Sequence, residues 1–146
     1  MTKTLLGLFA VLALMAGCTS MSTGYQAGGP VPQIESAPTG KAVIYVVRTR
    51  PDTSYLTAPL VLDDRIIGPT YAGTYMRLEV SPGRHRLTGY SDDNGSITLD
   101  VQADRIYFVQ HSVSGSWRAT SPHSFFTMMN EARARAAMAG AVNAAG

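Results

Sequence analysis

Apolar and polar residues alternate along much of the chain between residues 41 and 113, with the two-residue period of half-buried strands. Residues 75–80 and 97–102 alternate most regularly, whereas residues 42–47 are apolar throughout and rich in β-branched side chains. The first pattern predicts strands with one buried face, and the second predicts a central strand buried on both faces. Turn residues separate these segments, namely Asp63-Asp64, Ser81-Pro82-Gly83, Asp92-Asp93-Asn94-Gly95 and Ala103-Asp104. We therefore expect an all-β fold, a small antiparallel β-sandwich. Residues 84–90 are expected to form the return strand after the Pro-Gly turn.

The last part of the chain changes to a helical pattern. An apolar stripe would run along one side of a helix, formed by Phe125, Met129, Ala132, Ala136 and Ala139. Ser121 or Ser124 can cap such a helix, and Pro122 suits a first helical position. We expect a C-terminal helix from about residue 125 to about residue 139, followed by a fraying tail.

The first residues carry the pattern of an export signal. Lys3 precedes a nearly unbroken apolar run over residues 5–16, which ends at Gly17-Cys18. This run is shorter than the roughly 20 apolar residues of a membrane-spanning helix. Residues 19–40 are rich in Ser, Thr, Gly and Pro without apolar periodicity, which predicts a flexible tether. The expected organisation is a signal peptide over 1–17, Cys18 and a tether over 18–40, a β-sandwich over 41–120, and a helix and tail over 121–146.

The stretch Leu14-Met15-Ala16-Gly17-Cys18 resembles the lipobox of bacterial lipoproteins. The resemblance implies that the Cys18 thiol is acylated, that the chain is cut before it, and that membrane lipid is its first partner. Met15 stands where the family usually has Leu. Thr19, rather than Asp, follows the cysteine, which in Gram-negative lipoproteins implies transfer to the outer membrane, on its periplasmic face. Two or three acyl chains anchor a protein stably, whereas one binds marginally.

The domain is similar to the DUF2846 family of uncharacterised bacterial lipoproteins and resembles PEGA-type or Ig-like β-sandwich domains. The resemblance lies in the runs Lys41-Ala-Val-Ile-Tyr-Val-Val-Arg48, Leu62-Asp63-Asp64-Arg65-Ile66-Ile67-Gly68-Pro69, Gly73-Thr74-Tyr75, Ser81-Pro82-Gly83-Arg84-His85 and Ala103-Asp104-Arg105-Ile106-Tyr107-Phe108-Val109. It covers residues 41–113 and leaves out the expected helix. Because these motifs consist of turn and core residues, the resemblance implies a fold and no catalytic residue.

The charge of the chain argues against a nucleic-acid partner. Without Lys3, eleven of the 12 Lys and Arg residues remain against 10 Asp and Glu residues, so the mature chain is nearly neutral. The arginines are scattered among acidic residues, which is typical of a solvated surface. The single cysteine excludes an internal disulfide, and no motif calls for a cofactor.

The three histidines are the candidate acid-base or metal-binding groups. His85 and His111 fall in expected strands and could approach one another in a sheet, but no close metal-ligand spacing joins them or His123. Residues 92–95 lack the rest of a calcium loop, and no Gly-x-Ser-x-Gly or Ser-x-x-Lys motif occurs. We expect structural histidines, with neither a metal site nor a catalytic residue.

Trp117, Phe125, Phe126 and Met129 are the candidate interaction residues, because they lie near the junction of sandwich and helix and could form an exposed apolar patch. The alternative is that they seal the edge of the sandwich. We expect a non-enzymatic envelope lipoprotein with an interaction or structural role, an accessory subunit that meets an envelope protein partner. A second hypothesis is a periplasmic binding module for cell-wall glycan or a small ligand, built on Tyr71, Tyr75 and Tyr90. A third is a hydrolase that uses a histidine and a serine.

Overall fold

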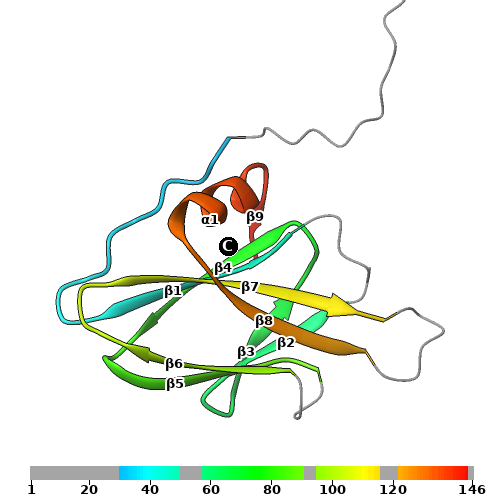
Figure 1. Ribbon diagram of the computed structural model, residues 1–146, viewed down its shortest axis with the longest axis horizontal. Coiled ribbons are helices and arrows are strands. Elements are labelled where there is room, and N and C mark those ends of the chain that lie inside the picture. The colour runs from blue at the N-terminus through cyan, green and yellow to red at the C-terminus, as the bar shows by residue number, and fades with distance from the viewer. Residues whose placement is uncertain (1–29, 50–56, 91–94, 116–121, 145–146) are drawn as a thin grey trace, which may run out of the picture.

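The computed structural model describes residues 30–49, 57–90, 95–115 and 122–144, and these form two packed β-sheets with a helix on one side (Figure 1). Sheet A has the strand order β8-β7-β1-β4-β9, and sheet B has the order β3-β2-β5-β6. The elements are β1 (Ala42–Arg48), β2 (Ala58–Leu62), β3 (Arg65–Thr70), β4 (Thr74–Val80), β5 (Gly83–Thr88), β6 (Ser96–Val101), β7 (Ile106–Ser114), β8 (His123–Met129), α1 (Glu131–Met138) and β9 (Val142–Asn143). The expected small all-β sandwich with a C-terminal helix is confirmed.

Strand β1 is the centre of the molecule, as its uninterrupted apolar sequence predicts. All seven of its residues are buried, and it lies between β4, which is antiparallel to it, and β7, which is parallel to it. Because side chains alternate along a strand, Ile44 and Val46 enter one apolar cluster while Val43 and Tyr45 enter another. The strand is therefore apolar on both faces because each face has its own core.

Two apolar clusters follow from this arrangement. The inner core lies between the sheets and includes Leu60 and Leu87 of sheet B and Leu78 of sheet A. The outer core lies on the other face of sheet A, where Ala134 and Met138 of α1 cover Tyr45 and Phe108. The molecule thus has three layers, with α1 above sheet A and sheet B below it (Figure 1).

The turns predicted from the sequence occur in sheet B. Asp63 and Asp64 join β2 to β3 and both have positive φ, 47° and 64°, which fits the two-residue turns that match the twist of a hairpin. Strands β5 and β6 pair from Gly83↔Val101 to Thr88↔Ser96, so this hairpin is confirmed, although residues 91–94 lie outside the described residues. Asp104 also has positive φ, 60°.

The expected return of residues 84–90 beside the preceding strand is wrong. β4 pairs with β1 and β9 in sheet A, whereas β5 pairs with β2 and β6 in sheet B. The Ser81-Pro82 turn therefore carries the chain between sheets, and the turn before β7 does so again. Sheet A also contains parallel pairs, β1 with β7 and β4 with β9. Turn residues specify where a chain reverses, but they do not specify which sheet receives the next strand.

The C-terminal helix is shorter than expected and begins later. Residues 123–129 form β8, which pairs along its whole length with β7, and α1 begins after Asn130, whose side chain accepts a hydrogen bond from the Arg133 amide at 2.8 Å. Ser124 is thus a strand residue and no helix cap. Phe125 to Met129 form a strand because the edge of β7 is open to pair with them, and tertiary pairing overrides a weak helical pattern. Within the described residues, no helix is long and apolar enough to span a membrane.

Candidate functional site

The two ends of the sandwich differ in their connections. At one end the chain reverses in short turns, at residues 63–64, 81–82 and 102–105. At the other end the last residues of β1, β5 and β7 lie together, and the longer connections that follow them include residues outside the described ranges (Figure 1). Binding and catalytic residues concentrate on such loops when a rigid scaffold positions them. We call this the loop end.

Beneath the loop end the inner core becomes polar. Arg48, Thr70, His111 and Ser124 are each at most 2% exposed, and they come from the halves of β1, β3, β7 and β8 that lie nearer the loop end. Buried polar groups are tolerated only when they are hydrogen-bonded. Here the Arg48 Nη1 donates to the Thr70 carbonyl at 2.9 Å, and the remaining three side chains form a chain of hydrogen bonds.

The hydrogen bonds around His111 fit one assignment of its ring hydrogens. The Thr70 hydroxyl donates to the Ala58 carbonyl at 3.0 Å, so its oxygen, 3.2 Å from the His111 Nδ1, must accept from that nitrogen. The Ser124 oxygen accepts from the Tyr90 amide at 2.9 Å, which leaves the serine hydrogen for the His111 Nε2 at 2.9 Å. This pattern fits a neutral imidazole that carries its hydrogen on Nδ1. The network joins both sheets, because Thr70 lies in sheet B while His111 and Ser124 lie in sheet A.

Close packing surrounds this network. The His111 ring stacks on Phe126 with centroids 4.5 Å apart. Gly89 approaches from the end of β5, and a Cβ atom added there would lie 2.2 Å from the Ser124 Oγ and 3.2 Å from the His111 Nε2. The absence of a side chain at position 89 is therefore what lets the Tyr90 backbone reach Ser124.

The Ser124–His111–Thr70 chain has the hydrogen-bond order of a nucleophile, a base and an orienting group. Both Ser124 and His111 are fully buried, however, so a substrate atom has no path to the hydroxyl in this conformation. The hydrogen bonds of Thr70, His111 and Ser124 connect β3, β7 and β8 with Tyr90, which follows β5. One signal in the sequence could have indicated this network, namely a charged residue, Arg48, at an inward position of an otherwise apolar strand.

His85 does not approach His111, because His85 lies on β5 of sheet B and His111 on β7 of sheet A. The His85 Nδ1 contacts the Asp63 Oδ2 at 2.6 Å, and its Nε2 contacts the Ser81 carbonyl at 2.7 Å. Since both acceptors require a donor, the doubly protonated ring fits best. Desolvation lowers the pKa of His85, but the hydrogen bonds to Asp63 and Ser81 and the Asp63 charge outweigh it and raise this pKa above 6.5.

The His85–Asp63 pair is expected to make stability depend on pH. The Arg86 amide and then His85 lower the Asp63 pKa below 3.8. The contribution of His85 to the free energy of unfolding is complete below pH 6.5 and is lost as pH rises through its raised pKa. The contribution of Asp63 is complete above pH 3.8 and is lost as pH falls through its lowered pKa. The full effect thus lies between these limits. Since Asp63 is 44% exposed, we expect about 0.2–1 kcal/mol.

This expectation is measured by denaturant unfolding at about pH 5 and about pH 8.5, for the wild type and for His85→Gln. The wild type should lose more free energy of unfolding between the two pH values than the variant does. His123→Gln is the matched control and should behave as the wild type. Equal pH dependence in the wild type and His85→Gln would refute the role of this pair.

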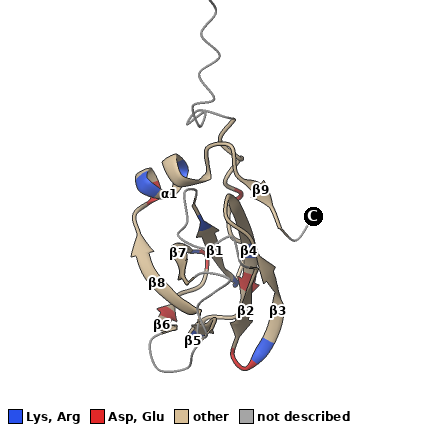
Figure 2. Cartoon of the chain, turned by 90° about the vertical axis from the view of Figure 1, so that its right-hand side faces the viewer, with Lys and Arg blue, Asp and Glu red and all other residues tan. Residues whose placement is uncertain are grey.

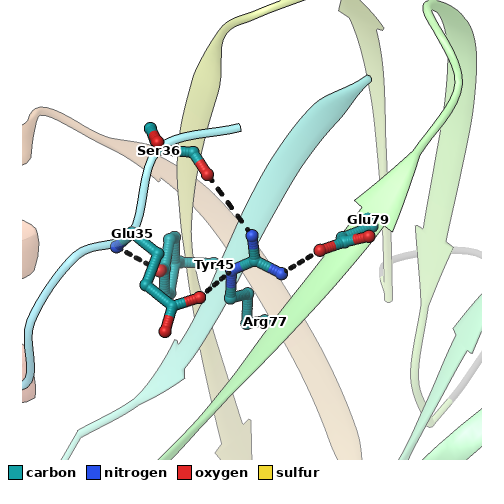
Figure 3. Close-up of polar contacts among 5 residues, drawn as sticks. All are labelled: Glu35, Ser36, Tyr45, Arg77 and Glu79. Atoms are coloured by element: carbon teal, nitrogen blue, oxygen red, sulfur yellow. Dashed lines mark hydrogen bonds and ion pairs between the residues drawn. The ribbon is translucent and has the colours of Figure 1, made fainter. Parts of the chain in front are cut away.

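Part of the segment expected to be a tether packs on the domain. Residues 30–40 run along the outer face of sheet A, where Ile34 and Ala37 pack against the outer core. We call these residues the strap. The Glu35 amide donates to the Tyr45 hydroxyl at 3.1 Å, and the Arg77 Nη2 donates to the Ser36 carbonyl at 3.4 Å (Figure 3). The composition of this segment did not reveal its apolar contacts, because only Ile34 and Ala37 make them and these two residues form no apolar pattern in the sequence.

Arg77 of β4 is the polar centre of the strap contact. Its Nη1 donates to the Glu79 carboxylate, and its buried Nε forms an ion pair with the Glu35 Oε2 at 3.5 Å without a hydrogen bond (Figure 3). The hydrogen bond to Glu79 is the main cause that raises the pKa of Arg77, so the guanidinium stays charged. The strap is therefore held by a charge-assisted cluster as well as by apolar packing.

The four candidate interaction residues do not form one patch. Phe125 is 46% exposed on β8, whereas Phe126 faces the inner core against His111 and Met129 is buried in the outer core. Adjacent strand residues point to opposite faces, which separates Phe125 from Phe126. Trp117 and the lipidation residue Cys18 lie outside the described residues.

The tyrosines of the ligand-binding alternative lie in different settings. Tyr71 is 48% exposed in the turn between β3 and β4. Tyr75 packs in the outer core, 6.2 Å from the Tyr45 ring. Tyr90 follows β5 of sheet B, and its hydroxyl donates to the Thr57 carbonyl. Because Tyr75 belongs to the outer layer and Tyr90 to the loop end of the other sheet, the three do not line a common face.

The described residues hold no group of three or more His, Cys, Asp and Glu side chains that could bind a metal ion. Comparisons with protein-family models, with curated proteins and with solved structures found no match to this chain.

Proposed function

We propose that this chain is a lipid-anchored protein of the bacterial outer membrane, and that its β-sandwich is a non-enzymatic interaction module within an envelope assembly. The observation that carries the proposal is the apolar run over residues 5–16 that leads to Gly17 and the single cysteine, Cys18. The resemblance of this stretch to a lipobox, and of the domain to DUF2846 lipoproteins, supports it.

Exposed apolar side chains at the sheet edges support an interaction role. Ile66 and Ile67 of the edge strand β3 are 79% and 41% exposed, and Phe125 of the edge strand β8 is 46% exposed. Such residues are candidate contacts with a protein partner. On β3 the shift of register beside Leu60 and the presence of Pro69 hinder indiscriminate pairing with other strands, so the exposed side chains there suit a specific contact.

The experiment compares the wild type with Cys18→Ser in bacterial cells, with a photo-crosslinking residue at Phe125 or at Ile66. We expect the wild type in the membrane fraction, with acyl groups detected on Cys18 by mass spectrometry and one discrete protein adduct. Cys18→Ser should carry no acyl groups and should lose the adduct, because the stable attachment of two or three acyl chains is gone. Phe126 and Met129 are unsuitable probe positions because their side chains face the cores.

Two controls complete this test. Thr19→Ala should leave both the fractionation and the adduct unchanged, and a probe at the exposed Thr98 of β6 should give no adduct. A wild-type chain that carries no acyl group on Cys18 would contradict the lipid anchor. An acylated wild type without any protein adduct would contradict the interaction role.

A further inference from the structure

The strap determines where the chain leaves the domain. At one end a turn at Gly40, with φ of 75°, is held by the Asp104 carboxylate, which accepts from the Gly40 amide at 2.8 Å. At the other end the Pro30 carbonyl accepts from the Gly140 amide at 3.3 Å. Between these points the strap rises from the start of β1 past α1 (Figure 1). The segment that leads to Cys18 therefore joins the domain beside α1 and β9, and not at the start of β1.

Two exposed valines flank this point. Val31 follows Pro30 and is 46% exposed, and Val142, two residues after Gly140, is 67% exposed. Pro30 is exposed as well. We call Pro30, Val31 and Val142 the exit patch. Neither valine belongs to the inner or the outer core, so the fold of the domain does not explain why these positions are apolar.

The length of the chain between Cys18 and Pro30 keeps the exit patch close to the anchor. A segment of this length spans at most about 40 Å when fully extended, and less in any bent conformation. A domain of this size has a radius of gyration of about 13 Å, so its opposite faces are roughly 30 Å apart. The surface around Pro30 is therefore the part of the domain that meets the bilayer most often.

The charge of α1 suits the same surface. Glu131, Arg133 and Arg135 are exposed on the helix. The two arginines and one glutamate give α1 a net charge of +1. Arg135 is paired with Glu131 at 2.6 Å, and the Arg133 Nη2 donates to the Gln110 side chain at 3.0 Å. Figure 2 shows these basic positions of α1 on the side of the molecule from which the strap leaves. Basic side chains are attracted to the anionic headgroups of a bilayer.

From these observations we infer that the exit patch and α1 lie against the lipid surface of the bilayer that holds the acylated Cys18, so that sheet B faces away from the membrane. The inference rests on the proposed function, because it requires the lipid anchor. It adds a fixed orientation, in which the exposed Ile66 and Ile67 of β3 point away from the bilayer toward a partner.

The test uses the full acylated chain, reconstituted in vesicles of phosphatidylethanolamine and phosphatidylglycerol. Acylation blocks the thiol of Cys18, the single cysteine, so a cysteine introduced at Val142 or at Ile66 alone takes an environment-sensitive fluorophore. We expect the emission at position 142 to shift to the blue and to lose most of its intensity when spin-labelled lipid is added. The label at position 66 should show neither change, and it is the matched control because Ile66 is also an exposed apolar strand residue.

A second set of variants tests the patch itself. The label is placed on Ala136→Cys, an exposed position of α1, and the exit patch is changed by Val31→Asp together with Val142→Asp. Quenching of the α1 label should fall to the level seen at position 66. Ile66→Asp with the same label should leave the quenching unchanged.

The outcomes separate this inference from the proposed function. A chain that carries no acyl group and does not join the vesicles overturns both. An acylated chain that is quenched equally at positions 142 and 66 overturns the orientation and leaves the anchor standing. In cells, a photo-crosslinking residue at Val142 that forms an adduct with a protein instead of lipid also overturns the inference.

Discussion

His111→Ala is expected to lower the free energy of unfolding by about 3–5 kcal/mol. The side chain is fully buried and stacks on Phe126 with centroids 4.5 Å apart. Its removal leaves a cavity and takes away one of the hydrogen-bond partners of each of the Thr70 and Ser124 hydroxyls, which lie 3.2 and 2.9 Å from the ring nitrogens. Buried hydroxyls that lose their partners retain their desolvation cost. Equilibrium unfolding in urea measures the change.

His123→Ala is the matched control for this prediction, because His123 is half-buried at the first position of β8 and lies outside both apolar cores. We expect it to cost less than about 1 kcal/mol. His111→Gln should recover part of the lost stability, because the amide retains a donor and an acceptor. A loss below about 1 kcal/mol for His111→Ala would show that the network does not hold the loop end together.

Gly89→Ala is expected to cost about 2–5 kcal/mol, through overpacking and broken hydrogen bonds. The new Cβ atom would lie 2.2 Å from the Ser124 Oγ and 2.6 Å from the Ser124 Cβ, so β5 and β8 must move apart. That movement would also stretch the bond between the Tyr90 amide and the Ser124 Oγ, now 2.9 Å. Thermal and urea unfolding should both report the loss.

Gly68→Ala supplies the comparison. Its Cβ atom would meet only the Met76 Cε, at 3.3 Å, and a flexible methionine end can yield, so we expect a change within about 1 kcal/mol. A double-mutant cycle of Gly89→Ala with Ser124→Gly tests the cause, since removing the serine side chain removes the clash. If the losses of unfolding free energy in the two single variants simply add in the double variant, the strain caused by Gly89→Ala does not arise at Ser124.

Both variants concern the same part of the molecule. The polar network ties the ends of β3, β7 and β8 to the chain after β5, and these elements border the long connections of the loop end. A network that is fully bonded and buried gives such an end a single conformation. The network therefore holds the described ends of β3, β7 and β8 and the residues after β5 in one arrangement.

Much of the fold could be predicted from the local sequence. The apolar run of residues 42–47 indicated a central strand, and β1 is indeed buried on both faces. The Asp63-Asp64 and Ala103-Asp104 turns occur where the residue types favour positive φ. The export signal and the acylation of Cys18 remain predictions, drawn from residues 1–18 alone.

Other features depend on contacts between distant residues. Residues 125–129 fit a helical stripe and a strand equally well, and pairing with β7 decided for the strand. Likewise, the alternation along β4 and β5 showed which side chains are buried. It did not show that these two consecutive strands belong to different sheets, which the assembly of the two sheets decided.

The candidate sites divide in the same way. The sequence by itself determined the strands between residues 42 and 114, the tight turns and the lipobox-like stretch, because each depends on residues close together in the chain. Only the tertiary structure brought Thr70, His111 and Ser124 into one network and laid the strap against Arg77. Those contacts join residues far apart in the chain, and their hydrogen bonds form only once the two sheets and the helix have excluded water from between them.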